Sequence, residues 1–93
     1  MKVLELILEE RKHQKALGYD AEHDNTHTNN EISLAASCYL LKCSHPGITT
    51  EIQNNLNWEI YPSNWDYKSN LVKGIALAIA ELERVIRSEK DGV

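Results

Sequence analysis

The chain of 93 residues lacks any apolar run close to the roughly 20 residues that are needed to span a bilayer. Acidic residues interrupt its first stretch, "MKVLELILEERKHQ", and no small-residue cleavage site follows, so we expect no signal peptide and a cytoplasmic location. Basic residues are few and scattered, and the formal net charge is −4. We therefore expect neither a membrane nor a nucleic acid as a partner.

Cysteine is also scarce, since Cys38 and Cys43 are the only two. They lie five residues apart in a segment that is expected to be helical. This spacing turns about 500° around a helix, which places the two thiols too far apart for a disulfide. We interpret both as small buried side chains in a reducing compartment.

No alternating strand pattern, internal repeat or low-complexity tract occurs, so the sequence predicts one all-α domain over residues 1–93. Apolar residues at helical spacing predict three main helices, at about residues 2–17, 29–43 and 69–87. Between the last two, the segment 51–68 is expected to form a short helix or an ordered loop rich in aromatic residues.

Local signals set the expected ends of these helices. Gly18 is a natural stop for the first helix. Thr28 and Glu31 match a capping box, in which each side chain bonds the backbone N–H group of the other residue, at the start of the second. Ser69 or Asp66 is a candidate cap for the last helix.

The second and third helices are the most apolar. The second has apolar residues on more than one face, which predicts a central position or a subunit interface, and we expect a homo-oligomer. The last helix carries a broad apolar stripe, formed by Leu71, Val72, Ile75, Ala76, Ile79, Leu82 and Ile86.

The first helix places polar residues on a face that begins as core. Continuing the spacing from Val3 and Ile7 leads to Glu10 and Gln14, with Arg11 beside them. Because buried polar groups are costly without hydrogen bonds, two interpretations are open. The second half of the helix is solvated, or it joins a polar network to which Glu83 of the last helix contributes.

The segment "EHDNTH" contains the densest group of titratable residues. His23, His27 and Glu31 are spaced by four, and Asp24 adds a carboxylate, so these residues are candidate ligands of a divalent metal. The capping box at Glu31 would instead place both histidines before the helix. They and Asp24 would then order the loop by hydrogen bonds to the backbone, Arg11 or Gln14.

Most of the aromatic residues lie close together, at Trp58, Tyr61, Trp65 and Tyr67. They either cover a small core or form a stacking wall for a planar ligand. Lys68, Lys73 and Arg11 are cations that could meet a phosphate, although the sequence has no glycine-rich phosphate loop.

The motifs "EERKHQ", "GYDAEHDNTH", "EISLAASCYLL" and "NLVKGIALAIAELERV" resemble those of a family of small, mostly uncharacterised proteins of tailed phages and prophages. The resemblance covers nearly the whole chain and implies a phage or prophage origin, with the cytoplasm of an infected or lysogenic host as its location. One segment departs from the pattern, because many relatives have W-P-W and W-W-K-P motifs where this chain has "WEIYPSNWDYK". The positions that match are Glu10, Arg11, Gln14, Gly18, Tyr19, Glu22, His23, Asp24, His27, Tyr39, Trp65, Leu71, Lys73, Ala80, Glu81, Glu83 and Arg84.

The first helix is also loosely similar to that of phage MazG-like nucleotide pyrophosphohydrolases, which are small and all-α. Those enzymes hold Mg²⁺ with an E-E-x-x-E motif on one helix and an E-x-x-D motif on the next. Here Glu5, Glu9 and Glu10 lie on the first helix, and no E-x-x-D motif follows on the last.

Two functions remain as hypotheses. In the first, the chain is a phage accessory protein without a cofactor that sequesters a nucleotide-like molecule, or binds a host protein, and so counteracts host defence. In the alternative, it is a nucleotide pyrophosphohydrolase dependent on Mg²⁺ or Mn²⁺, with catalytic residues Glu10, Asp24 and His27. The predicted metal ligands are His23, Asp24, His27 and Glu31. The predicted ligand-binding residues are Arg11, Gln14, Tyr19, His23, Asp24, His27, Trp65 and Lys73.

Overall fold

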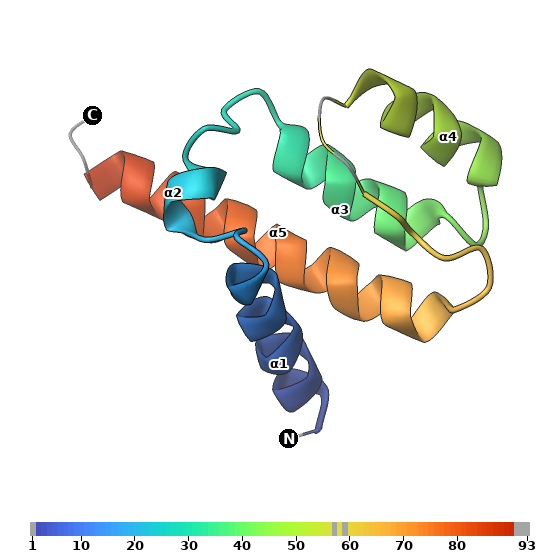
Figure 1. The fold of residues 1–93 in the computed structure, drawn as a ribbon, viewed down its shortest axis with the longest axis horizontal. Coiled ribbons are helices and arrows are strands. Elements are labelled where there is room, and N and C mark those ends of the chain that lie inside the picture. The colour runs from blue at the N-terminus through green and yellow to red at the C-terminus, as the bar shows by residue number, and fades with distance from the viewer. Residues whose placement is uncertain (1, 57, 59, 91–93) are drawn as a thin grey trace.

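The computed structural model describes residues 2–56, 58 and 60–90, and this part of the chain is helical without strands. The predicted all-α class is therefore confirmed (Figure 1). No helix among these residues is both long and apolar enough to cross a membrane. The helices are α1 (Lys2–Ala16), α2 (Ala21–Asp24), α3 (Glu31–Leu41), α4 (Pro46–Asn55) and α5 (Tyr67–Lys90).

The long helix α5 organises the fold. Helix α3 packs along one side of α5, α4 covers α3, and α1 packs against the middle of α5 (Figure 1). The N-terminal half of α1 extends away from the other helices. The molecule is flat, with principal extents of 41 × 35 × 19 Å, because few helices lie above one another.

Small side chains dominate the contact between α3 and α5. A Cβ atom on Gly74 would lie 3.0 Å from the Leu40 side chain and 3.1 Å from the carbonyl oxygen of Ala36. The two helices therefore approach closely where glycine and alanine face each other. Both cysteines are free, as predicted, and Cys38 is buried in this core, whereas Cys43 is only partly buried. The buried cluster consists of Ile32, Ala35, Ala36, Cys38, Ile60, Leu77 and Ala80.

The start of α3 differs from the prediction. The N-cap is Asn30, which has a φ of 67° and makes no side-chain cap hydrogen bond. The left-handed conformation, which asparagine tolerates, turns the chain into the helix. The predicted capping box at Thr28 is wrong, because the Glu31 carboxylate accepts a hydrogen bond from the Asn29 backbone N–H (2.6 Å) and α3 begins only at Glu31.

Helix α4 also begins earlier than expected for the segment 51–68. Pro46 lies in the first turn, where its fixed φ suits a helix and its missing N–H costs nothing. Thr49 and Thr50 both donate hydrogen bonds to the Pro46 carbonyl oxygen (2.9 Å each). The sequence "SHPGITT" therefore starts a helix.

The last helix extends beyond the predicted 69–87 at both ends. Its cap is Asp66, whose carboxylate accepts from the Ser69 backbone N–H at 3.0 Å. The loop before it is fastened by the buried Asn70 side chain. The amide of Asn70 accepts from the Ser63 N–H (3.0 Å) and donates to the Ser63 carbonyl oxygen (2.7 Å).

Candidate functional site

A buried ion pair joins α1 to α2. The Arg11 guanidinium donates to the Asp24 carboxylate at 3.0 Å, and the two side chains are 7% and 2% exposed. Arg11 also donates to the backbone carbonyl oxygen of Tyr19 (3.0 Å) and lies 3.4 Å from the half-exposed Glu83 carboxylate. These contacts agree with the second interpretation of the polar face of helix α1, in which its polar residues join a network.

The two histidines of "EHDNTH" continue this network towards α3. His23 Nδ1 lies 3.0 Å from the second oxygen of Asp24, and His27 Nδ1 lies 3.4 Å from Glu31. Their Nε2 atoms are 3.2 Å apart. The Asp20 carboxylate holds His23 in place by accepting from its backbone N–H at 3.1 Å.

The Nδ1 atom of each histidine faces a carboxylate, which favours the tautomer that carries a proton there. Acidic and basic side chains therefore alternate from Glu83 through Arg11 and Asp24 to the histidine pair and Glu31.

The pKa of Glu31 lies below its ordinary value. The main cause is the hydrogen bond from its own backbone N–H, and the bonds from Asn29 and His27 act in the same direction. The charged carboxylate is thus the form that the start of α3 favours.

The predicted metal ligands are close together, but they do not converge. The Asp24 and Glu31 carboxylates contact the Nδ1 sides of the histidines, while the two Nε2 atoms face each other. Within residues 2–56, 58 and 60–90, no three His, Cys, Asp or Glu side chains form a group that could hold a metal ion. A closed four-ligand site is therefore not built here.

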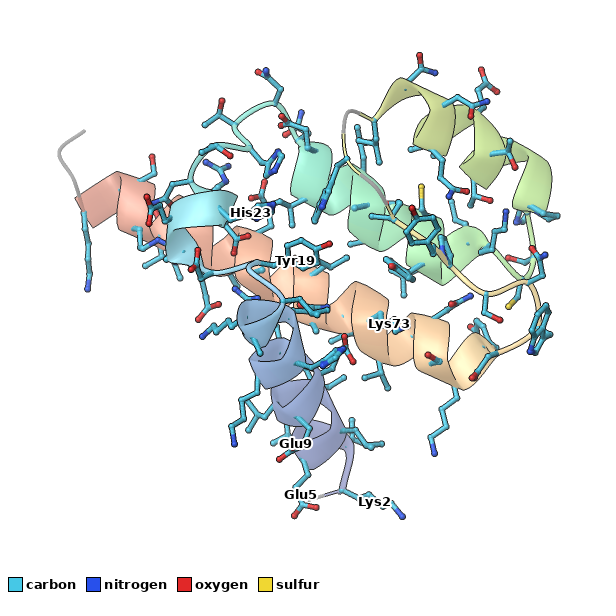
Figure 2. The ribbon with its side chains drawn as sticks, in the orientation of Figure 1. Lys2, Glu5, Glu9, Tyr19, His23 and Lys73 are labelled. Atoms are coloured by element: carbon cyan, nitrogen blue, oxygen red, sulfur yellow. The ribbon has the colours of Figure 1, made fainter. Side chains whose placement is uncertain are left out.

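Aromatic rings cover the histidine pair. Trp58 stacks on His27 with centroids 5.1 Å apart and lies 5.4 Å from the His23 ring. Tyr19 contacts His23 at 5.0 Å and meets Trp58 edge to face at 5.5 Å. Figure 2 shows Tyr19 and His23 close together where α1 gives way to α2. These rings form a wall between the charged network and a neighbouring pocket.

The pocket lies on the other side of this wall and has a volume of about 230 Å³. Its aromatic lining consists of Tyr19, Trp58, Tyr39 and Tyr61. Its charged and titratable lining consists of Glu10, His13 and Lys73, and Gln14, Leu17, Ile60 and Leu77 complete it.

Two buried polar atoms in the pocket lining have no hydrogen-bond partner among the described residues, Gln14 Oε1 and Trp58 Nε1. The amide nitrogen of Gln14 donates to the Lys73 carbonyl oxygen at 3.4 Å. Because that carbonyl can only accept, the orientation of the Gln14 amide is fixed and its oxygen is left over. An acceptor and a donor of two pocket-lining residues are thus both buried and unsatisfied, each at a cost of about 1–3 kcal/mol.

Tyr39 and Lys73 line the pocket from α3 and α5. The Lys73 ammonium lies 6.0 Å from the centroid of the Tyr39 ring. Burial raises the pKa of the Tyr39 hydroxyl, which also accepts a hydrogen bond from the Tyr61 N–H at 3.4 Å. This hydroxyl is therefore neutral, and its proton can be donated to a ligand.

The predicted ligand-binding residues divide into three groups. Gln14, Tyr19 and Lys73 line the pocket. Trp65 is 84% exposed and lies outside the lining. The others, Arg11, His23, Asp24 and His27, belong to the network behind the wall.

The proposed catalytic set is likewise divided. Glu10 lines the pocket, whereas Asp24 and His27 are engaged in the network. Figure 2 shows Glu5 and Glu9 on the projecting part of α1, away from Tyr19 and His23. Sequence reasoning missed Ile60 and Leu77, whose only signal was their apolar character. Tyr39 matched the phage pattern without being assigned to the site.

Neither the protein-family models, nor the curated proteins, nor the solved structures contain a match to this chain. The fold and the site together define a small all-α protein with an aromatic pocket beside a buried charge network.

Proposed function

We propose that this chain binds a small, planar, nucleotide-like molecule in the pocket and acts by sequestering it. The observation that carries the proposal is the aromatic and polar lining of the pocket, in which Gln14 and Trp58 each have one buried polar atom without a partner, Oε1 and Nε1. If the two side chains turn towards a bound ligand, a ligand edge with one donor and one acceptor satisfies both atoms. Amide-like edges of this kind are typical of nucleobases, and the aromatic lining offers faces on which a base can stack.

The size and charge of the pocket further limit the class of ligand that it can bind. A volume of about 230 Å³ is below the roughly 300 Å³ at which pockets for drug-sized molecules begin, which suits a single base with part of its sugar. Lys73 can meet a phosphate, while Glu10 would repel one. We therefore infer that any phosphate lies on the Lys73 side.

The existing hydrogen bonds of the predicted catalytic residues favour sequestration over hydrolysis. Asp24 is buried against Arg11, and both ring nitrogens of His27 have partners. Glu10 is the one member of the catalytic set in the pocket lining. The pyrophosphohydrolase alternative would need Asp24 and His27 to leave these partners and a bound Mg²⁺ or Mn²⁺ ion.

A biological role follows from the resemblance to small phage proteins. A protein that sequesters a nucleotide-like signal in the cytoplasm would weaken a host defence that depends on that signal. A host protein as partner is the other possibility under the same role, and it predicts no small ligand in the pocket.

Trp58 provides the test, because its ring lines the pocket. In a Trp65→Phe background, which removes the exposed tryptophan, fluorescence reports Trp58 alone. Titration with nucleobases, nucleosides and nucleoside mono-, di- and triphosphates should give a saturable change for one class. Gln14→Met should weaken binding by roughly three- to tenfold, the loss of one hydrogen bond. Lys15→Met, an exposed neighbour on the same helix, should leave it unchanged.

Chromatography of the bound molecule separates the two functions. Under sequestration, heat denaturation releases the ligand intact and EDTA has no effect. Turnover of a nucleoside triphosphate with Mg²⁺ or Mn²⁺, lost in Asp24→Asn, would establish the hydrolase instead. Absence of any saturable change across the panel would reject the binding proposal.

A further inference from the structure

Helix α5 has a second apolar face that the rest of the molecule leaves uncovered. Ile75, Leu82 and Ile86 are 39%, 61% and 45% exposed. Successive members from 71 to 85 are spaced four, three, four and three residues apart, which is the heptad spacing of helices that pair along their length. We call this face the outer stripe, and it consists of Leu71, Ile75, Ala78, Leu82, Val85 and Ile86.

The other faces of α5 are occupied by contacts within the chain. Helix α1 meets it at the Lys73 carbonyl oxygen and at Glu83, and α3 meets it at Gly74. The residues of α5 that are buried in these contacts are small or polar except for one leucine; they are Asn70, Gly74, Ala76, Leu77 and Ala80. The most exposed apolar side chains of α5, Leu82 and Ile86, thus lie on the uncovered face. A contiguous apolar face of this kind marks an interaction site in a water-soluble domain.

We propose that the outer stripe is the interface of a dimer, in which α5 packs antiparallel against α5 of a second copy. A two-fold axis between Ala78 and Ile79 pairs four residues of the stripe with one another, and it pairs Val85 with the neighbouring Val72. Leu71 then meets Ile86 of the second copy, and Ile75 meets its Leu82. The small Ala78 lies at the crossing, where it permits close approach of the two helices.

Charges at the ends of the stripe select this direction. Lys68 lies beside its first residue and Glu89 beyond its last, and both are exposed. The same two-fold axis brings Lys68 of each copy opposite Glu89 of the other. Parallel helices would instead place lysine against lysine and glutamate against glutamate, which is unfavourable. One antiparallel register therefore buries the apolar residues of the stripe and also pairs the opposite charges at its ends.

The first experiment measures molar mass by light scattering and sedimentation over a range of protein concentrations. The wild-type chain should have the mass of a dimer, and Leu82→Glu should have that of a monomer while far-ultraviolet circular dichroism stays helical. Ile48→Glu on α4 alters another exposed apolar residue (51%, against 61% for Leu82) outside the stripe and should remain dimeric. A wild-type monomer, or a folded Leu82→Glu dimer, would overturn the proposal.

A charge exchange tests the direction and does not depend on the fate of Leu82→Glu. Lys68→Glu places two like pairs in the antiparallel dimer and should raise its dissociation constant on the order of tenfold. Adding Glu89→Lys should restore the wild-type constant. A double variant that is no tighter than the single one would reject the antiparallel register. The measurement needs no ligand, so its result is independent of the pocket.

Discussion

The ion pair between Arg11 and Asp24 gives the sharpest quantitative prediction, for the substitution Asp24→Asn. Both side chains are nearly inaccessible, and the atoms that pair are 3.0 Å apart. Removing one partner of a buried ion pair leaves the other charge uncompensated, at a cost of about 3–5 kcal/mol. Asparagine keeps one acceptor oxygen for Arg11 or His23, so we expect a loss of about 2–4 kcal/mol. That is a large part of the roughly 5–14 kcal/mol expected for a domain of this length.

Glu83→Gln is the matched control, because it changes the other carboxylate that Arg11 contacts. The Glu83 side chain is 43% exposed and its oxygen lies 3.4 Å from Arg11 Nε. Solvent screens such a pair, and its loss should cost no more than about 1 kcal/mol. The contrast between the two substitutions isolates burial as the cause.

Urea denaturation followed by circular dichroism measures both losses. In a double-mutant cycle, Arg11→Met combined with Asp24→Asn should cost less than the sum of the single changes, by about 2 kcal/mol. Sodium chloride should change the effect of Asp24→Asn little, because a buried pair is weakly screened. The reasoning is refuted if Asp24→Asn costs no more than Glu83→Gln, or if the two members of the cycle are additive.

Three further predictions concern packing, the aromatic loop and pH. Gly74→Ala should destabilise by about 1 kcal/mol in urea denaturation, since the new methyl group meets a backbone carbonyl oxygen, whereas Gly47→Ala, which meets open space, should stabilise by about 0.5 kcal/mol. Asn70→Leu should cost about 2 kcal/mol by the same assay and should shift the Trp58 fluorescence, because it frees the loop backbone. The free energy of unfolding should fall as the pH drops below about 4.5. Folding lowers the pKa of Glu31, so its carboxylate stabilises the folded chain only while it is charged. The free energy of unfolding should also fall as pH rises above 10, because the raised pKa of Tyr39 favours its neutral form. Equal stability at pH 4 and pH 7, or at pH 9 and pH 11, would contradict the pH predictions.

The sequence was informative where local patterns carry the physics. Helical spacing predicted the class and the approximate bounds of α1, α3 and α5. The polar residues Glu10, Arg11 and Gln14 on an apolar face left a network as one of two interpretations, since such groups are buried only with partners. Asp24 and Glu83 were both candidate partners of Arg11, and the structure has both contacts, through the turn after α1 and through helix packing.

Periodicity was less informative about which face of a helix turns inward. The stripe that begins at Leu71 predicted an apolar helix, yet its largest members, such as Leu82 and Ile86, lie outside. Close approach of α3 and α5 requires small residues, and Gly74 and Ala80 supply them on the opposite face. A hydrophobic pattern weights large side chains most, so here it marked the face of α5 that the other described helices leave exposed.

The two tryptophans of the aromatic loop show why the sequence alone did not predict the pocket. Trp58 and Trp65 belong to one loop and are equally suited to stacking, but Trp58 contacts the histidines while Trp65 is 84% exposed. The Asn70 amide bonds both backbone groups of Ser63, which fastens the second half of the loop at the start of α5. That contact joins residues that no periodic pattern links. The position of this loop therefore follows only from the folded chain.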